Sequence, residues 1–185
     1  TLGAKMVMSR TGLLQLIKIH LPAPGTPFDI DKTDIVADSL KVITKLPVIA
    51  AQKLGFVKNW TKQESLETGI PTEHKDIFAT EWQTITKTDA TVKSAYKITS
   101  EPVQKDTFFL RESDADTEAT RLLDLFKVPR FIFGFKGSAR LIDLKLGDAV
   151  TITHSRFGMS GGKAGMVVGL SINWDDFTVD VDGIL

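Results

Sequence analysis

The stretch AGMVVGLSINWDDFTVDVDGI, residues 164–184, decides the fold because apolar and polar residues alternate along it in two runs. A period of two is typical of strands that pack one face on a core and expose the other. Asp175-Asp176 separates the runs and predicts a short turn, so the two strands form a hairpin. The residues expected to face inward are Met166, Val168, Leu170, Ile172, Trp174, Phe177, Val179 and Val181, with Thr178, Asp180 and Asp182 outward.

The same period extends upstream. PRFIFGFKG, residues 129–137, places Phe131, Phe133 and Phe135 on one strand face. GDAVTITH, residues 147–154, places Val150 and Ile152 on one face and threonines on the other. The C-terminal part of the chain therefore reads as a run of antiparallel strands.

Residues 113–127, SDADTEATRLLDLFK, have helical spacing instead. Ser113 is the expected N-cap, and Asp114 and Asp116 would lie in the first turn, where the helix dipole favours acidic side chains. The apolar face expected at this spacing is Ala115, Ala119, Leu122, Leu123 and Phe126. The predicted fold class is α+β, predominantly antiparallel β (a sheet or partial barrel), with one clear helix at 113–127.

The N-terminal half is less regular. Residues 4–21 predict two extended runs joined by a turn at Arg10-Thr11-Gly12, and the second run reads as a strand buried on both faces or paired with a missing upstream partner. A short helix is expected from Thr33 or Asp34 to Leu40, and a strand within residues 89–100. We expect two domains, a β-rich N-terminal lobe over residues 1–110 and a helix with a β-meander or partial barrel over residues 111–185.

Composition narrows the function classes. The chain has 185 residues, no cysteine and a formal net charge of zero. Disulfides, thiolate catalysis and zinc–thiolate sites are excluded, and no overall field attracts nucleic acid. No apolar run reaches the length that spans a bilayer, so membrane insertion is not expected. The start at Thr1 is neither an initiator methionine nor a signal peptide, which favours a fragment of a longer protein.

The loop RFGMSGGKAGMVVG, residues 156–169, raises the question of a phosphate site. A P-loop requires G-x-x-x-x-G-K-[ST] before a helix. Here Gly158 and Gly162 are one residue too close, Ala164 replaces the Ser/Thr, and a strand follows. A flexible hairpin connection is the favoured interpretation, with Gly158, Gly161, Gly162 and Lys163 as candidate contacts to a partner.

No catalytic or metal-binding pattern emerges. His20, His74 and His154 are scattered, and neighbours such as His154 and Ser155 point to opposite faces of a strand. The acidic tail lacks the spacing of a calcium loop, and PRFIFGFKGSAR departs from the RNA-binding signature. Nothing brings Glu67, Asp76, Glu81 or Asp89 together as the carboxylate pair of a glycoside hydrolase. We therefore expect no enzyme activity, no cofactor and no metal.

Three short motifs in the C-terminal part carry a resemblance. Leu146–Thr153 fits LGD-x-V-x-(L/I)-T, Arg156–Met159 with Gly162-Lys163 fits R-x-G-(L/M)-x-x-G-K, and Val168-Gly169 with Asn173-Trp174 fits V-x-G-x-x-x-(D/N)-W. In this order the segment resembles the C-terminal β-segment of tail proteins from long-tailed phages and prophages. SRTGLLQLIKIHLP, KLGFVKNWT and ESDADTEATRLLDL resemble upstream elements of the same group. Ala149 is a departure, since a larger aliphatic residue is usual there.

The resemblance implies a baseplate-hub or tail-tip protein related to the host-specificity protein. Such a protein is a structural part of the virion tail, made in the cytoplasm of the bacterial host, and acts by assembly as a homotrimer with other tail proteins. Trp60 and Trp82 are the candidate interface aromatics. Two alternatives stay open, namely a carbohydrate- or receptor-binding module of the tail tip and, less favoured, a cell-wall hydrolase.

Overall fold

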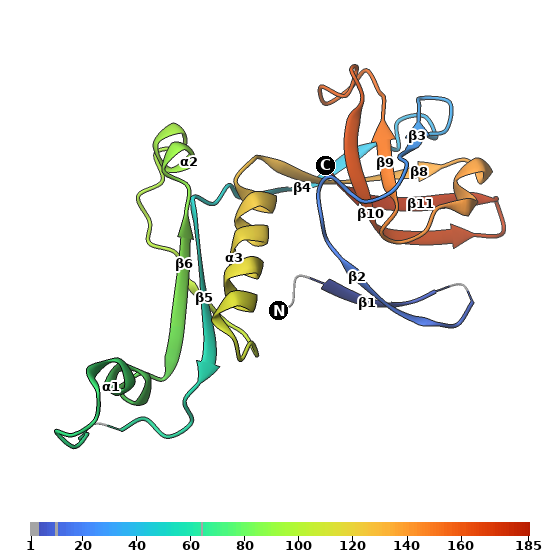
Figure 1. The fold of residues 1–185 in the computed structure, drawn as a ribbon. Coiled ribbons are helices and arrows are strands. Elements are labelled where there is room, and N and C mark those ends of the chain that lie inside the picture. Colours follow the sequence, from blue (N-terminus) through green and yellow to red (C-terminus); the bar gives the residue numbers. More distant parts are fainter. Residues whose placement is uncertain (1–3, 10, 64) are drawn as a thin grey trace. The chain divides into compact units, whose positions relative to one another are not determined.

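A computed structural model describes residues 4–9, 11–63 and 65–185, so that Thr1 and the expected turn residue Arg10 lie outside the described residues. Across this part of the chain there are eleven strands, three α-helices and one 3₁₀ helix (Figure 1). In order they are β1 (Ala4–Met8), β2 (Leu14–Lys18), β3 (Phe28–Ile30), β4 (Lys41–Leu46), β5 (Ala51–Lys58), α1 (Thr72–Ala79), β6 (Trp82–Thr88), α2 (Ala90–Ala95), β7 (Gln104–Asp106), α3 (Glu112–Phe126), β8 (Arg130–Gly137), η1 (Ala139–Asp143), β9 (Ala149–Ile152), β10 (Lys163–Asn173) and β11 (Thr178–Ile184). The predicted α+β class with mainly antiparallel strands is confirmed, and the described strands form open sheets without a closed barrel.

The described residues form two compact units. Among the described residues, the inserted unit lies within Val48–Val128, and the sheet unit comprises residues 4–47 and Pro129–Leu185. β4 and β8 are antiparallel neighbours in one sheet, with Lys41 opposite Gly134. The inserted unit therefore interrupts the chain between two strands that pair with each other.

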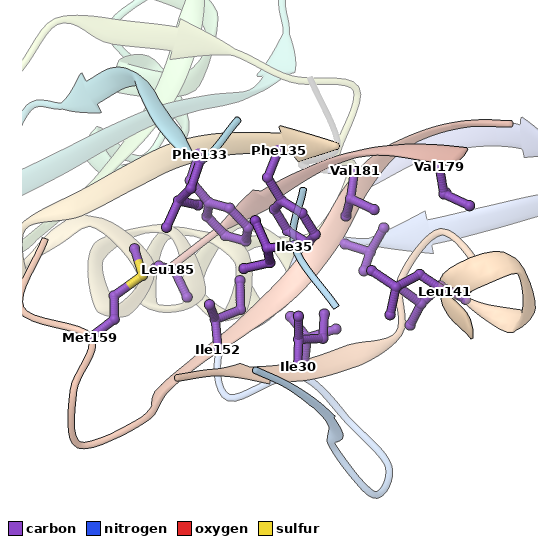
Figure 2. Packing of buried hydrophobic residues seen from close by; sticks show 14 residues of the cluster. Ile30, Ile35, Phe133, Phe135, Leu141, Ile152, Met159, Val179, Val181 and Leu185 are labelled. Carbon is purple, nitrogen blue, oxygen red and sulfur yellow. The ribbon is translucent and has the colours of Figure 1, made fainter. Parts of the chain in front are cut away.

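The sheet unit is built on a six-stranded sheet in the order β3-β9-β10-β11-β8-β4. Every pairing is antiparallel except that of β3 with β9. Its core contains Phe133, Phe135, Val150 and Ile152, as the alternation predicted, with the two phenylalanine rings stacked 6.0 Å apart (Figure 2). β3 and β4 come from the N-terminal half, so residues far apart in sequence complete one hydrophobic core.

The expected inward row of β10 is only partly correct. Met166 and Val167 are both buried, and the register between β10 and β11 shifts between Val167 and Gly169. A β-bulge of this kind exchanges the two faces of a strand. Beyond it Leu170 and Ile172 pack against the core as expected, whereas Trp174, also expected in the core, lies after the end of β10 and is exposed.

The hairpin between β10 and β11 is confirmed, with Asn173 opposite Thr178. Val179 and Val181 are buried as expected, but Phe177 is not. Phe177 has φ 51°, in the left-handed region, so it belongs to the turn and not to the strand that follows. Its side chain therefore does not share the inward face of β11.

The inserted unit has a three-stranded sheet in the order β6-β5-β7 with α3 against it. Leu54 on β5 is buried with Ala119 and Leu122 of α3, and an ion pair of 2.6 Å joins Lys87 to Asp116. The helix begins at Glu112, and its N-cap is Arg111, two residues before the expected cap Ser113. Ser113 lies within the helix, and its carbonyl accepts a hydrogen bond from the Thr117 hydroxyl.

Two further local predictions are wrong. Residues 89–100 contain helix α2, because the Asp89 side chain accepts a hydrogen bond from the Val92 amide and caps it. The expected helix from Thr33 or Asp34 to Leu40 is absent, and the segment is a turn in which Asp34 is buried. In both places a single aspartate side chain fixes the local backbone.

Candidate functional site

The glycine loop connects β9 to β10, which are antiparallel partners, so the predicted hairpin connection is confirmed. Met159 is buried and holds the loop, because its carbonyl accepts hydrogen bonds from the amides of His154 and Gly162. Gly158 and Gly162 have φ of 69° and 78°, which glycine adopts without steric cost. A strand and not a helix follows, so no helix N-terminus faces this loop.

The candidate contact residues of this loop are at its surface. A Cβ placed at Gly158 or Gly161 would meet no atom within 4 Å, so both backbones border open space. At Gly162 a Cβ would come within 3.2 Å of the Thr151 side chain, so this glycine also permits close packing. Lys163, the first residue of β10, is exposed. Their role as partner contacts remains a prediction.

The structure brings Trp60 and Trp82 together, although they are separated in sequence. Trp82 begins β6 opposite Lys58, and Trp60 follows β5. The Lys58 ammonium lies 4.4 Å from the centroid of the Trp60 ring and 5.3 Å from that of Trp82, within the range of cation–π attraction. Trp60 is 81% exposed, whereas Trp82 is half-buried. The interface role of these two residues stays a prediction.

The segment after β7 adds residues to this place that sequence reasoning did not single out. Thr107 is buried and its hydroxyl donates to the Gly55 carbonyl at 2.7 Å, which turns its neighbour Phe108 outward. Phe108 is 95% exposed, and Leu110 is also exposed. With Trp60 and Trp82 they line a groove of about 340 Å³. The sequence signal that could have identified them is the alternation in DTFFLRE, residues 106–112, because Phe108 and Leu110 lie two residues apart and so point to the same side of an extended segment.

A second exposed apolar surface is the β1–β2 hairpin. Met6 pairs with Leu16 and Met8 with Leu14, so the four side chains share one face, and all are exposed. The expectation that the second strand is buried on both faces is therefore wrong, whereas a pairing with a missing upstream segment stays a prediction. A contiguous apolar patch of this kind is typical of an interaction surface.

The titratable groups of the sheet unit form structural contacts. Asp34 is buried and forms an ion pair with Arg140, whose guanidinium carbon lies 4.8 Å from the centroid of the Phe28 ring. The hydrogen bond to Asp34 raises the pKa of Arg140. This contact fixes the loop after β3 to η1. Among the described residues, no group of three or more His, Cys, Asp or Glu side chains is placed to hold a metal ion.

The described helices include none that is both long enough and apolar enough to cross a membrane. Two surfaces are candidates for the functional site. One is the exposed groove with aromatic residues on the inserted unit, and the other is the apolar face of the β1–β2 hairpin on the sheet unit. Surfaces of these types bind other molecules without the need for a reactive group.

Comparison with known proteins gives structural neighbours only. No protein-family description matches the chain, and no curated protein matches it. Among solved structures, a chain from the virion of a native gene transfer agent particle aligns over 98% of this chain with a TM-score of 0.60 and 11% identity. The chain therefore shares its fold with a virion component.

Two prophage tail proteins are also similar. Prophage tail protein gp18 from Listeria monocytogenes EGD-e has a TM-score of 0.48, 15% identity and 98% coverage of this chain. The 43 kDa tail protein of prophage MuSo2 from Shewanella oneidensis has a TM-score of 0.45, 12% identity and 99% coverage. The chain spans 36%, 48% and 50% of the lengths of these three neighbours.

Proposed function

We propose that the chain is a structural component of a phage or prophage tail tip or baseplate hub. It acts by assembly with itself, as a homotrimer, and with other tail proteins, and not by catalysis. The observation that carries the proposal is the apolar hairpin face of Met6, Met8, Leu14 and Leu16, which has the character of a surface that another protein covers.

The fold likeness to a virion chain supports a role in a virion assembly for this surface. A tail component needs open sheets with surfaces for neighbouring subunits, and it needs neither a metal site nor a catalytic pair. A zero net charge also gives the chain little electrostatic protection against association.

Immunogold labelling of purified particles from the source strain tests this proposal, with antibody raised against the chain. Gold at the distal end of the tail is the expected result. Particles without label, under conditions in which the antibody recognises the purified chain, would contradict a virion role. Label along the whole tail would retain the virion role and contradict a position at the tip.

A second candidate function is a carbohydrate- or receptor-binding module of the tail tip. The observation that favours it is the exposed Trp60 ring beside the groove formed with Trp82 and Phe108, because exposed aromatic rings provide flat apolar contact area. A glycan array probed with the chain and with Trp60→Ala tests it. Binding that is lost in the variant supports this function, and an array without binding contradicts it.

A further inference from the structure

In one groove of the sheet unit every charged side chain of the lining is basic. The groove measures about 320 Å³, and its charged lining residues are Lys45, Arg130 and Lys163, with no acidic side chain among the lining residues. Phe131 and Phe157 contribute apolar walls. We call this the basic groove. Its volume is similar to that of pockets that hold small ligands. Its basic and aromatic lining favours an acidic group that has an apolar neighbour.

Two features of the basic groove favour an anionic occupant. Lys45 and Lys163 are exposed and available to a partner, and Phe157 is half-exposed at the rim. Burial lowers the pKa of Arg130, since a desolvated cation is unfavourable. Arg130 already has an interaction within the chain, so Lys45 and Lys163 are the cations that a partner meets.

The turn between β10 and β11 has the complementary composition. Trp174, Asp175, Asp176 and Phe177 form what we call the acidic tip, and all four side chains are exposed. Trp174 is 64% exposed and Phe177 is 60% exposed. Trp174 also lines a groove beside the β1–β2 hairpin, which leaves Phe177 as the aromatic residue free to enter a partner.

The acidic tip is held in one conformation. The Asn173 side chain accepts a hydrogen bond from the Asp175 amide at 3.0 Å, and Asp176 accepts one from the Thr178 hydroxyl at 2.6 Å. The Thr178 bond lowers the pKa of Asp176, so this carboxylate stays charged in moderately acidic solution. Lys136 lies 3.5 Å from Asp176 and neutralises part of its charge. A fixed tip loses little conformational entropy when it binds.

We propose that the acidic tip of one copy of this chain docks into the basic groove of a second copy. The groove supplies two exposed lysines and two phenylalanine walls, and the tip supplies two carboxylates and an exposed phenylalanine. Electrostatic complementarity of this kind selects partner and orientation. The inference rests on the proposed self-assembly and assigns a contact to it.

The tip cannot reach the groove of its own chain. β11 runs from Thr178 at the tip to Ile184, next to Leu185 in the groove lining, so at about 3.3 Å per residue the two sites are roughly 20 Å apart along a rigid strand. Figure 2 shows Met159 and Leu185 at one end of the core and Val179 at the other. The contact is therefore between different surfaces of two copies, which generates a ring if the rotation closes.

A charge-exchange experiment with the 185-residue chain tests the contact. One variant carries Asp175→Lys and Asp176→Lys, and the other carries Lys45→Asp and Lys163→Asp. In each variant the tip and groove have charges of the same sign, so we expect self-association in sedimentation velocity to weaken at least tenfold. In an equimolar mixture the tip of each variant meets a groove of opposite charge on the other variant, so pairwise association returns, although a ring of three copies would keep one contact between like charges.

Folding and total charge are controlled separately. The double variant Asp143→Lys with Asp180→Lys changes two exposed carboxylates of the same unit away from the tip, and we expect it to associate like the unmodified chain. Circular dichroism checks that all variants are folded. Association that either charge reversal leaves unchanged, or that mixing does not restore, would overturn the contact.

A chain that stays monomeric at millimolar concentration would also overturn the contact. The virion role has an independent readout in immunogold labelling. Label at the tail end together with a monomeric chain would therefore discard the tip–groove contact and retain the proposed function.

Discussion

Replacing Gly183 by alanine should destabilise the sheet unit, because this residue lies directly opposite Phe133 on the neighbouring strand. An alanine Cβ would approach the Phe133 ring to 2.7 Å at Cε1 and more closely at Cζ, and it would lie 3.2 Å from the Met166 carbonyl oxygen. Carbon atoms in contact are normally 3.5–4.0 Å apart, so the ring must move by about 1 Å or the strands must separate. Overpacking of this kind costs about 1–3 kcal/mol.

The assay is urea unfolding followed by circular dichroism, with hydrogen exchange of the β8 amides to identify the transition of the sheet unit. A loss of about 2 kcal/mol corresponds to a midpoint lower by roughly 1 M urea. Gly161→Ala is the matched control, because its Cβ meets nothing within 4 Å, and its effect should stay within about 0.5 kcal/mol.

The Phe133→Leu background identifies the cause. Leucine removes the far ring atoms that alanine at position 183 would meet, so the second substitution should cost at least about 0.5 kcal/mol less in this background. Strictly additive effects, or a Gly183→Ala variant as stable as the Gly161→Ala control, would refute the proposed clash.

Three further changes test other contacts. Glu118→Ala leaves the Arg121 guanidinium without its buried carboxylate, and thermal unfolding should show a loss of about 3 kcal/mol. Asp89→Ala removes the cap of α2 and should cost about 1 kcal/mol, measured as faster exchange of the α2 amides, whereas Asp89→Ser should retain most of the protection. Thr178→Val should raise the pKa of Asp176 toward its ordinary value in an NMR titration. The depressed pKa stabilises the fold at neutral pH, and this stabilisation is lost as the pH falls through the folded-state value, so the variant should be less pH-dependent below pH 4.

The sequence predicted the regular parts of the fold because each was determined by a local period. The face of α3 containing Ala119 and Leu122 follows from helical spacing, and the burial of Val179 and Val181 follows from strand alternation. The helix limits were less predictable, because serine is a favoured N-cap residue but Ser113 lies two residues after the observed N-cap, Arg111.

Other features depend on long-range pairing that no local pattern contains. The bulge between Val167 and Gly169 depends on the pairing of β10 with β11, so the burial of Val167 beside Met166 could not be read from the alternation. The approach of Trp60 to Trp82 depends on the β5–β6 register that places Lys58 opposite Trp82. Both tryptophans were identified as candidate residues, but their common groove with Phe108 was not.

The acidic tip shows how turn geometry can override a correct strand pattern. Phe177 has the same parity as Val179 and was expected to be buried, but the left-handed backbone at this position places it in the turn. Full burial of a phenylalanine side chain stabilises a protein by about 1.5–3 kcal/mol. Phe177 and Trp174 stay largely exposed in the folded single chain, so most of this stabilisation is absent at both residues. A turn required only to connect two strands needs no aromatic residues. Two of them beside two carboxylates are therefore better explained by a contact outside the chain, and the basic groove is the described surface with the opposite charge and an apolar wall.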